Sequence, residues 1–90
     1  MSQAIVDPTE LKRFASHLKK FNAELRDRIT SLHSHMVGLS DSWRDQEHEK
    51  FVSEFEQTMH VLEHFLGQSD QHIPFLLRKA ERIEAYLQQG

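Results

Sequence analysis

The residues with the most evident potential for chemistry are two histidines and a glutamate near the middle of the chain. The segment His60-Val61-Leu62-Glu63-His64 has the H-x-x-E-H spacing of inverted zinc proteases. In that motif two histidines one helical turn apart bind zinc, and the glutamate activates water. A catalytic zinc also needs a third protein ligand and a walled cleft, for which a helical chain of 90 residues has little room. We interpret the match as coincidental and predict no metal or other cofactor.

No other set of residues typical of catalysis accompanies this motif. The sequence has no cysteine, no glycine-rich phosphate loop and no arrangement of Ser, His and Asp. We therefore predict that the protein is not an enzyme.

Histidine is the side chain that titrates between about pH 5 and pH 8, so an abundance of histidines is a potential source of pH dependence. Seven occur, at positions 17, 33, 35, 48, 60, 64 and 72.

The charge balance argues against nucleic acid as a partner. The chain carries 11 basic and 14 acidic residues, a net charge of -3, whereas phosphate backbones attract basic proteins. A basic row, Lys12-Arg13 and Lys19-Lys20, lies in the first helical segment and suits either an anionic lipid surface or the acidic segment 45–56. The alternative hypothesis for function is thus a membrane-associating amphipathic protein whose behaviour depends on pH.

Capping residues divide the chain into two long helices within a single domain, 1–90. Asp7 followed by Pro8 predicts a helix that starts at Pro8 and ends near residue 38. The polar stretch 38–42 predicts a tight turn, and a variant capping box at 42–45 predicts a second helix over about 42–88. Pro74 interrupts this second helix, which predicts either a kink or a break at that point.

Apolar residues follow both helices at spacings of 3 and 4, with one stutter between Leu25 and Ile29. The stripe is wider than a two-stranded coiled coil needs, and the second helix is longer than the first. The sequence therefore predicts an all-α helical hairpin that pairs with a second hairpin to form a four-helix bundle. The predicted core and dimer residues are Leu11, Phe14, Leu18, Phe21, Leu25, Ile29, Leu32, Phe55, Met59, Leu62, Leu66, Ile73, Leu76, Ile83 and Leu87.

Targeting signals are not evident in the sequence. The segment 1–6 lacks the basic start and apolar stretch of a signal peptide, and no run of 18 apolar residues occurs. We expect a cytoplasmic protein, or one exported without a cleaved signal peptide.

The turn and its flanks resemble a known family. A chain of about this length with a helix, a short polar turn, Trp43 in the turn and Phe51 eight residues later resembles the WXG superfamily of type VII secretion, the small ESAT-like hairpins. Asp45 stands where the family usually has Gly, so the turn is most similar to a divergent Gram-negative branch with Ser-Trp-Arg-Asp, whose members look like homodimeric hairpins. The family's C-terminal signature, a Tyr with an acidic residue four positions later, is not matched, because Gly90 follows Tyr86 at that distance.

The resemblance implies a protein-interaction module linked to a type VII-like secretion system, as a substrate or as a partner. It implies that Trp43 packs at the hairpin corner and contributes to an exposed recognition surface, with Arg44 and Asp45 beside it, and that Phe51 anchors this corner to the first helix. A purely structural role for Trp43, filling the turn, is the alternative. The expected partner is a second copy of the chain, and the alternatives are a paralogous hairpin or a secretion component.

Overall fold

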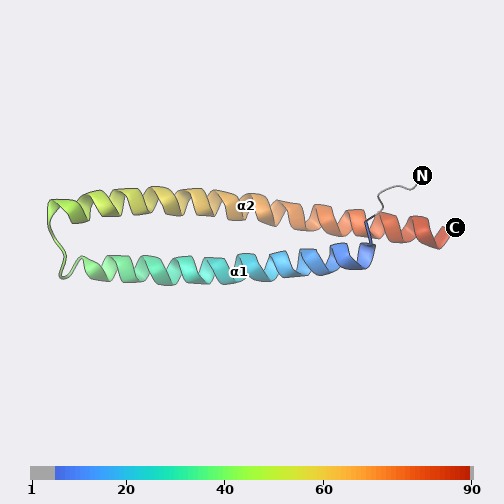
Figure 1. The fold of residues 1–90 in the computed structure, drawn as a ribbon, viewed down its shortest axis with the longest axis horizontal. Helices are drawn as coiled ribbons and strands as arrows, with labels where there is room; N and C mark the ends of the chain where they lie inside the picture. The colour runs from blue at the N-terminus through green and yellow to red at the C-terminus, as the bar shows by residue number, and fades with distance from the viewer. Residues whose placement is uncertain (1–5, 90) are drawn as a thin grey trace.

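Two antiparallel helices make up the protein. The computed structural model describes residues 6–89, in which α1 spans Pro8–Leu39 and α2 spans Gln46–Gln89. The helices lie side by side along their length, and α2 extends past the start of α1 (Figure 1). No strand occurs within residues 6–89, so the predicted all-α helical hairpin is confirmed. Most of the N-terminal segment on which the expectation about a signal peptide depends lies outside the described residues, as does Gly90.

The start of α1 follows from its capping residues. Asp7 is the N-cap, and its Oδ1 accepts a hydrogen bond of 2.9 Å from the backbone N–H of Thr9. Pro8 occupies the first helical position, where a missing N–H leaves no hydrogen bond unmade. Glu10 places a negative charge near the positive end of the helix dipole and pairs with Arg13 at 2.6 Å.

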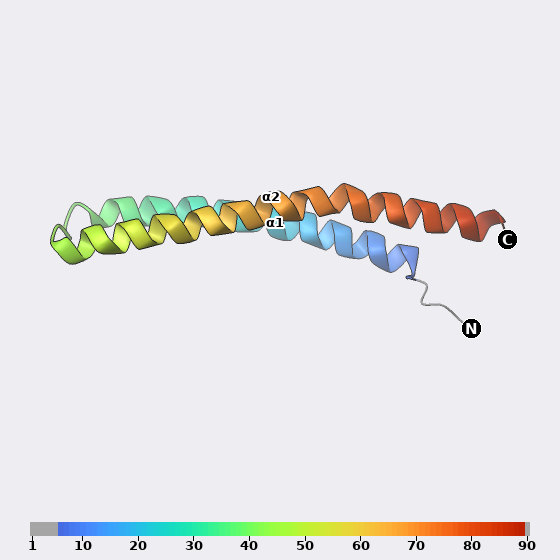
Figure 2. The same cartoon turned by 90° about the horizontal axis from the view of Figure 1, so that it is seen from above.

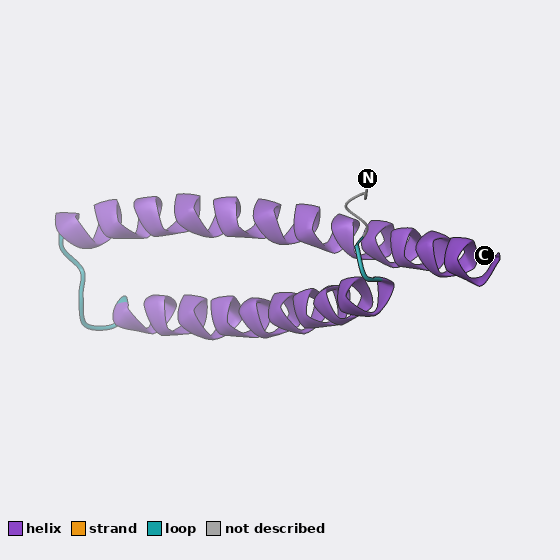
Figure 3. Cartoon of the chain, turned by 45° about the vertical axis from the view of Figure 1, so that its right-hand side comes forward, coloured by secondary structure: helices purple, strands orange, loops and turns teal. Residues whose placement is uncertain are grey.

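The connection between the helices lies later in the chain than the sequence suggests. α1 runs through Gly38 to Leu39, and α2 begins at Gln46, four residues beyond the predicted start at 42. The Leu39 carbonyl at the end of α1 holds the connection, because the backbone N–H groups of Ser42 and Trp43 both donate to it. No described residue has a positive φ, so Gly38 does not act as a left-handed helix terminator. In Figure 3 this connection is the teal segment that joins the two helices.

Pro74 lies inside α2, and the helix continues through it without a break. Figure 2 shows α2 changing direction in its orange segment, which includes the proline. Proline removes one backbone donor and crowds the preceding turn, and a helix accommodates both by bending. The kink is thus the alternative that the structure adopts.

The buried seam of α1 differs from the stripe of large apolar residues by one position in its first half. Ala15 and Asn22 are 0% and 1% exposed, whereas Phe14 and Phe21 are 56% and 49% exposed. With Ala15 and Asn22 in the seam, the spacing alternates between 3 and 4 without a stutter. The seam residues of α1 are Leu11, Ala15, Leu18, Asn22, Leu25, Ile29, Leu32, Met36 and Leu39.

The seam of α2 follows the same heptad rule along its length. It begins at the buried His48 and includes the buried residues Leu66, Ser69 and Ala80. Its members are His48, Val52, Phe55, Met59, Leu62, Leu66, Ser69, Ile73, Leu76, Ala80, Ile83 and Leu87. An uninterrupted repeat of seven residues is the pattern that keeps two helices in continuous contact.

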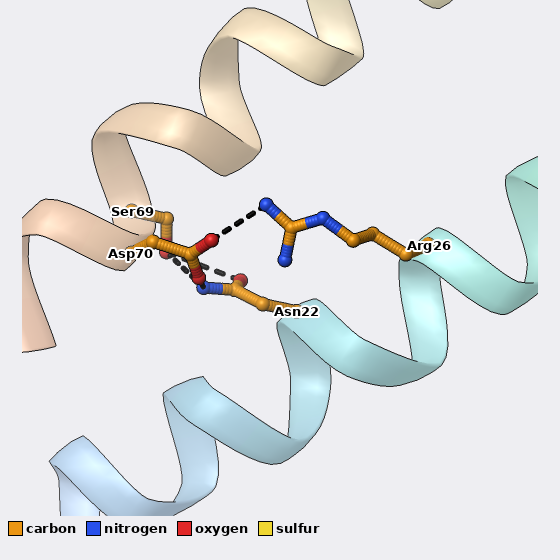
Figure 4. A network of polar contacts seen from close by, with 4 residues as sticks. All are labelled: Asn22, Arg26, Ser69 and Asp70. Atoms are coloured by element: carbon orange, nitrogen blue, oxygen red, sulfur yellow. Dashed lines mark hydrogen bonds and ion pairs between the residues drawn. The ribbon is translucent and has the colours of Figure 1, made fainter.

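A polar network joins the two seams where α1 and α2 both carry small side chains (Figure 4). Asn22 Nδ2 donates to Ser69 Oγ and to Asp70 Oδ1, both at 2.9 Å, and Ser69 Oγ donates back to Asn22 Oδ1 at 3.1 Å. Arg26 extends the network to the surface, with its guanidinium 2.6 Å from Asp70 Oδ2. We call these four residues the Asn22 network.

A single hairpin is too thin to enclose a core. Its principal extents are 68 × 21 × 16 Å, and the only apolar residues buried within 6–89 are Ala15, Met36, Leu66 and Ala80. Most other members of the two seams are half-buried between the helices. Much of the apolar surface that could stabilise the fold therefore remains exposed on one chain.

Candidate interaction surface

The hairpin corner is organised by an aromatic cluster. The ring of Trp43 lies edge-on to His48 with centroids 5.0 Å apart, and it lies 5.6 Å from the ring of Phe51. Phe51 in turn lies 5.7 Å from Phe55. The cluster thus links the connection to the first three turns of α2. Trp43 is half-buried, so part of its indole remains at the surface.

Polar contacts fix the position of this cluster relative to α1. The backbone N–H of Trp43 donates to the carbonyl of Leu39 at 2.8 Å, and Arg44 Nε donates to the carbonyl of Ser40 at 3.2 Å. The hydroxyl of Ser40 lies 3.3 Å from His48 Nε2, across the corner. The end of α1, the connection and the start of α2 are therefore held together by side chains as well as backbone.

Asp45 is the N-cap of α2. Its Oδ1 accepts a hydrogen bond of 3.0 Å from the backbone N–H of His48, and its carbonyl accepts from the same N–H at 3.1 Å. An aspartate suits this position because its side chain satisfies a backbone donor that has no partner within the helix. With no positive φ in the described residues, the corner does not require glycine two residues after Trp43.

One edge of the hairpin is closed by two ion pairs and one histidine–glutamate contact. Lys12 Nζ lies 2.8 Å from Glu84 Oε1, the Arg26 guanidinium pairs with Asp70, and His33 Nε2 lies 3.0 Å from Glu56 Oε1. All three pairs join α1 to α2 at heptad positions that flank the seam on the same side. We call this edge the charged flank, and it consists of Lys12, Arg26, His33, Glu56, Asp70 and Glu84.

Asp70 is the carboxyl group most affected by this arrangement. Its hydrogen bond from the Arg26 guanidinium lowers its pKa below the ordinary value of 3.8, and the hydrogen bond from Asn22 adds to the effect. A carboxylate that receives charge-assisted hydrogen bonds is favoured over its protonated form. Asp70 therefore stays ionised into acidic solution.

The opposite edge carries aromatic side chains and few charged partners. We call it the aromatic flank, and it consists of Phe14, Phe21, Phe51, Phe65, Phe75 and Tyr86, all of which are exposed. In heptad terms all of these residues lie on the side of the seam away from the charged flank, and all except Phe75 occupy the position directly beside the seam. Exposed apolar residues that gather along one face of a small protein mark an interaction surface more often than scattered ones do.

Two apolar grooves run along this flank. The first lies toward the open end of the hairpin, has a volume of about 470 Å³, and is lined by Phe14, Leu18, Phe65 and Phe75 among others. The second has a volume of about 520 Å³ and lies beside the corner, lined by Leu32, Leu39, Phe51 and Phe55 among others. Each groove therefore combines residues of both helices.

The residues predicted for the core and dimer interface fall into three groups in a single chain. Leu66 is buried, whereas Phe14, Phe21, Leu32 and Leu87 are exposed. The remaining members of the predicted set are half-buried. Ala15, Asn22 and Ser69 are buried but absent from the predicted set, because a stripe counted from large apolar residues passes over small and polar ones. Their heptad spacing from Leu18 and Leu66 is the signal that identifies them.

The zinc-protease-like segment does not converge with other ligands. His60 and His64 are exposed on α2, and Glu63 pairs with His60 at 3.7 Å. Within residues 6–89, no group of three or more His, Cys, Asp or Glu side chains is arranged to hold a metal ion. In the same range, neither helix is both long and apolar enough to cross a membrane.

Comparison with known proteins identifies the class to which this hairpin belongs. A family model described as WXG100, proteins of 100 residues with WXG, matches residues 3–88. The chain therefore belongs to the WXG100 family, small helical proteins linked to type VII secretion. A search of curated proteins and a search of solved structures each returned no match.

Proposed function

We propose that the chain is a non-enzymatic protein-interaction module that works as a homodimer. In this proposal two copies of the single hairpin domain pack through their aromatic flanks into a four-helix bundle, and the Trp43 corner docks on a component of a type VII-like secretion system. The chain would serve that system as a substrate or as a partner. The observation that carries the proposal is the exposure of six aromatic side chains along one edge of the hairpin, while the other edge is closed by two ion pairs and by the contact between His33 and Glu56.

The energetics favour a partner on this flank. Burying one large apolar side chain contributes roughly 1.5–3 kcal/mol, so leaving the aromatic flank in water forgoes a substantial part of the stability available to the fold. A domain of 90 residues has little stability to spare. A second copy offers the same apolar surface, and a two-fold axis brings identical patches together.

Charge favours an antiparallel pairing of the two hairpins. Residues 41–56, at the corner, include six acidic and two basic residues, a net charge of -4. Residues 11–20, at the open end, include four basic residues and no acidic one. An antiparallel dimer places each corner near the open end of its partner, so that opposite charges face each other; a parallel dimer places the two acidic corners together.

A pair of glutamate substitutions tests the interface. Phe14→Glu with Phe65→Glu puts two charges into the open-end groove, and we expect the molar mass measured by light scattering to fall from that of a dimer to that of a monomer. Val37→Glu is the matched control, because Val37 is equally an exposed apolar residue of α1 but lies off the aromatic flank. A dimer that survives the double substitution, or one that Val37→Glu disrupts equally, would contradict the proposed interface.

A further inference from the structure

The Asn22 network has a hydrogen-bonding pattern that only one alignment of the two helices satisfies. Both hydrogens of Asn22 Nδ2 are donated, one to Ser69 and one to Asp70, while Asn22 Oδ1 accepts from the Ser69 hydroxyl. Asn22 is 1% exposed and Ser69 is 5% exposed, so water does not compete for these groups. No buried side-chain nitrogen or oxygen of the described residues lacks a partner.

The rest of the seam specifies the alignment less strongly. Both helices repeat apolar residues every seven positions, so sliding α2 along α1 by one heptad still brings apolar side chains together. A slide that draws seven residues into the connection places Asn22 opposite Leu76 instead of Ser69. Its amide is then buried against hydrocarbon without partners, which is strongly unfavourable.

We propose that the Asn22 network is the element that sets the register of α1 against α2, and that it does so at the expense of stability. Asn22 and Ser69 are the polar members of the central seam. An apolar pair at the same positions would pack more favourably, but the native register and the register shifted by one heptad would then differ little in free energy. Asp70 and Arg26 continue the network to the surface and orient the Asn22 amide. The inference concerns pairing within one hairpin, so it is independent of the proposed dimer.

Distances between two spin labels report the register directly. The chain has no cysteine, so labels attach only at introduced sites, for which we choose Lys20→Cys and Gln57→Cys. Both positions are exposed, and neither takes part in a hydrogen bond or ion pair within residues 6–89. They are offset along the hairpin, so sliding by one heptad, about 10 Å along the axis, lengthens their separation. Dilution with unlabelled protein removes distances between copies.

The test compares the native network with an apolar version, Asn22→Leu with Ser69→Ala. The native chain should give one narrow distance, and the variant should remain helical, unfold at the same or a higher temperature, and show a second, longer distance. A single narrow distance in the variant would overturn the proposal, because the connection and apolar packing would then suffice to set the register. Loss of helicity would also overturn it, since the network would then supply stability rather than specificity.

A control separates the network from general changes to the seam. Ile29→Leu alters the seam residue of α1 that lies one heptad beyond Asn22, while conserving volume and leaving all four network residues in place. This variant should keep the single narrow distance of the native chain. A second distance in Ile29→Leu would show that the register depends on apolar packing at large, which contradicts a specific role for Asn22.

Discussion

The indole of Trp43 meets the imidazole of His48 edge-on, with ring centroids 5.0 Å apart and ring planes at 61°. His48 is the first seam residue of α2, so Trp43 covers the end of the seam at the corner of the hairpin. Its backbone is held at the same time by the carbonyl of Leu39. The tryptophan that characterises the family thus has a structural position here, closing the space where the two helices separate.

Truncating Trp43 should therefore weaken the fold. We expect Trp43→Ala to lower the free energy of unfolding by about 1–3 kcal/mol, less than for a fully buried aromatic residue because the indole is half-buried. Chemical denaturation followed by circular dichroism at a fixed protein concentration measures this loss. Trp43→Phe keeps an aromatic ring and should lose less than half as much. Unchanged stability in Trp43→Ala would mean that the indole serves recognition alone.

The capping role of Asp45 predicts a graded series of substitutions. Asp45→Ala removes the hydrogen bond to the His48 N–H and should cost about 0.5–2 kcal/mol, whereas Asp45→Gly, the residue typical of the family, should cost only a few tenths. Asp45→Asn keeps the acceptor and should be close to native. Asp41→Ala is the control, because Asp41 is exposed and precedes the helix start. Equal losses at both aspartates would contradict the cap.

The lowered pKa of Asp70 predicts a specific dependence on pH. Because its folded pKa lies below the ordinary value of 3.8, ionised Asp70 stabilises the folded state above about that pH. This contribution is lost as the pH falls from 3.8 through the lowered folded value. Asp70→Asn should therefore be less stable than the native chain at pH 7, and the difference should shrink at the lowest pH. Urea titrations at pH 7 and near pH 2.5 measure the free energy of unfolding of both proteins. An equal difference between the native chain and Asp70→Asn at the two pH values would contradict this prediction.

Burial of the aromatic flank between two copies predicts that the native chain does not bind lipid vesicles. We expect no co-sedimentation with vesicles containing anionic lipid at pH 7 or at pH 5, because the apolar surface that could insert is covered in the dimer. The monomeric variant Phe14→Glu with Phe65→Glu serves as a comparison that carries the same basic row. Binding of the native chain at pH 5 alone would favour the alternative of a membrane-associating protein whose histidines respond to pH.

The seam of α1 shows how far the sequence can be interpreted and where it misleads. The period of the apolar residues and the Asp7-Pro8 start predict a helix that the structure contains. Counting large apolar residues, however, selects Phe14 and Phe21 and leaves a stutter before Ile29. The helices instead approach through the neighbouring Ala15 and Asn22, because small side chains permit close contact and a buried amide is acceptable when Ser69 satisfies it.

The sequence does not fix the first residue of α2, because several residues near it could cap the helix. Asp41, Ser42 and Asp45 are all good N-cap residues, so local sequence does not decide between them. The choice depends on the Leu39 carbonyl at the end of α1, which accepts hydrogen bonds from the backbone N–H groups of Ser42 and Trp43 and leaves Asp45 to cap the helix. These hydrogen bonds depend on how the connection folds against the end of α1, which the local sequence does not specify.

The most direct test of the proposed homodimer is the absolute molar mass in solution. Light scattering over a dilution series, with helicity from circular dichroism at each concentration, should give twice 10.6 kDa together with high helicity, and both should fall together only at the lowest concentrations. A mass of 10.6 kDa at every concentration would contradict self-association through the aromatic flank. If that monomer were poorly helical, the second hairpin that completes the core would have to be a different chain.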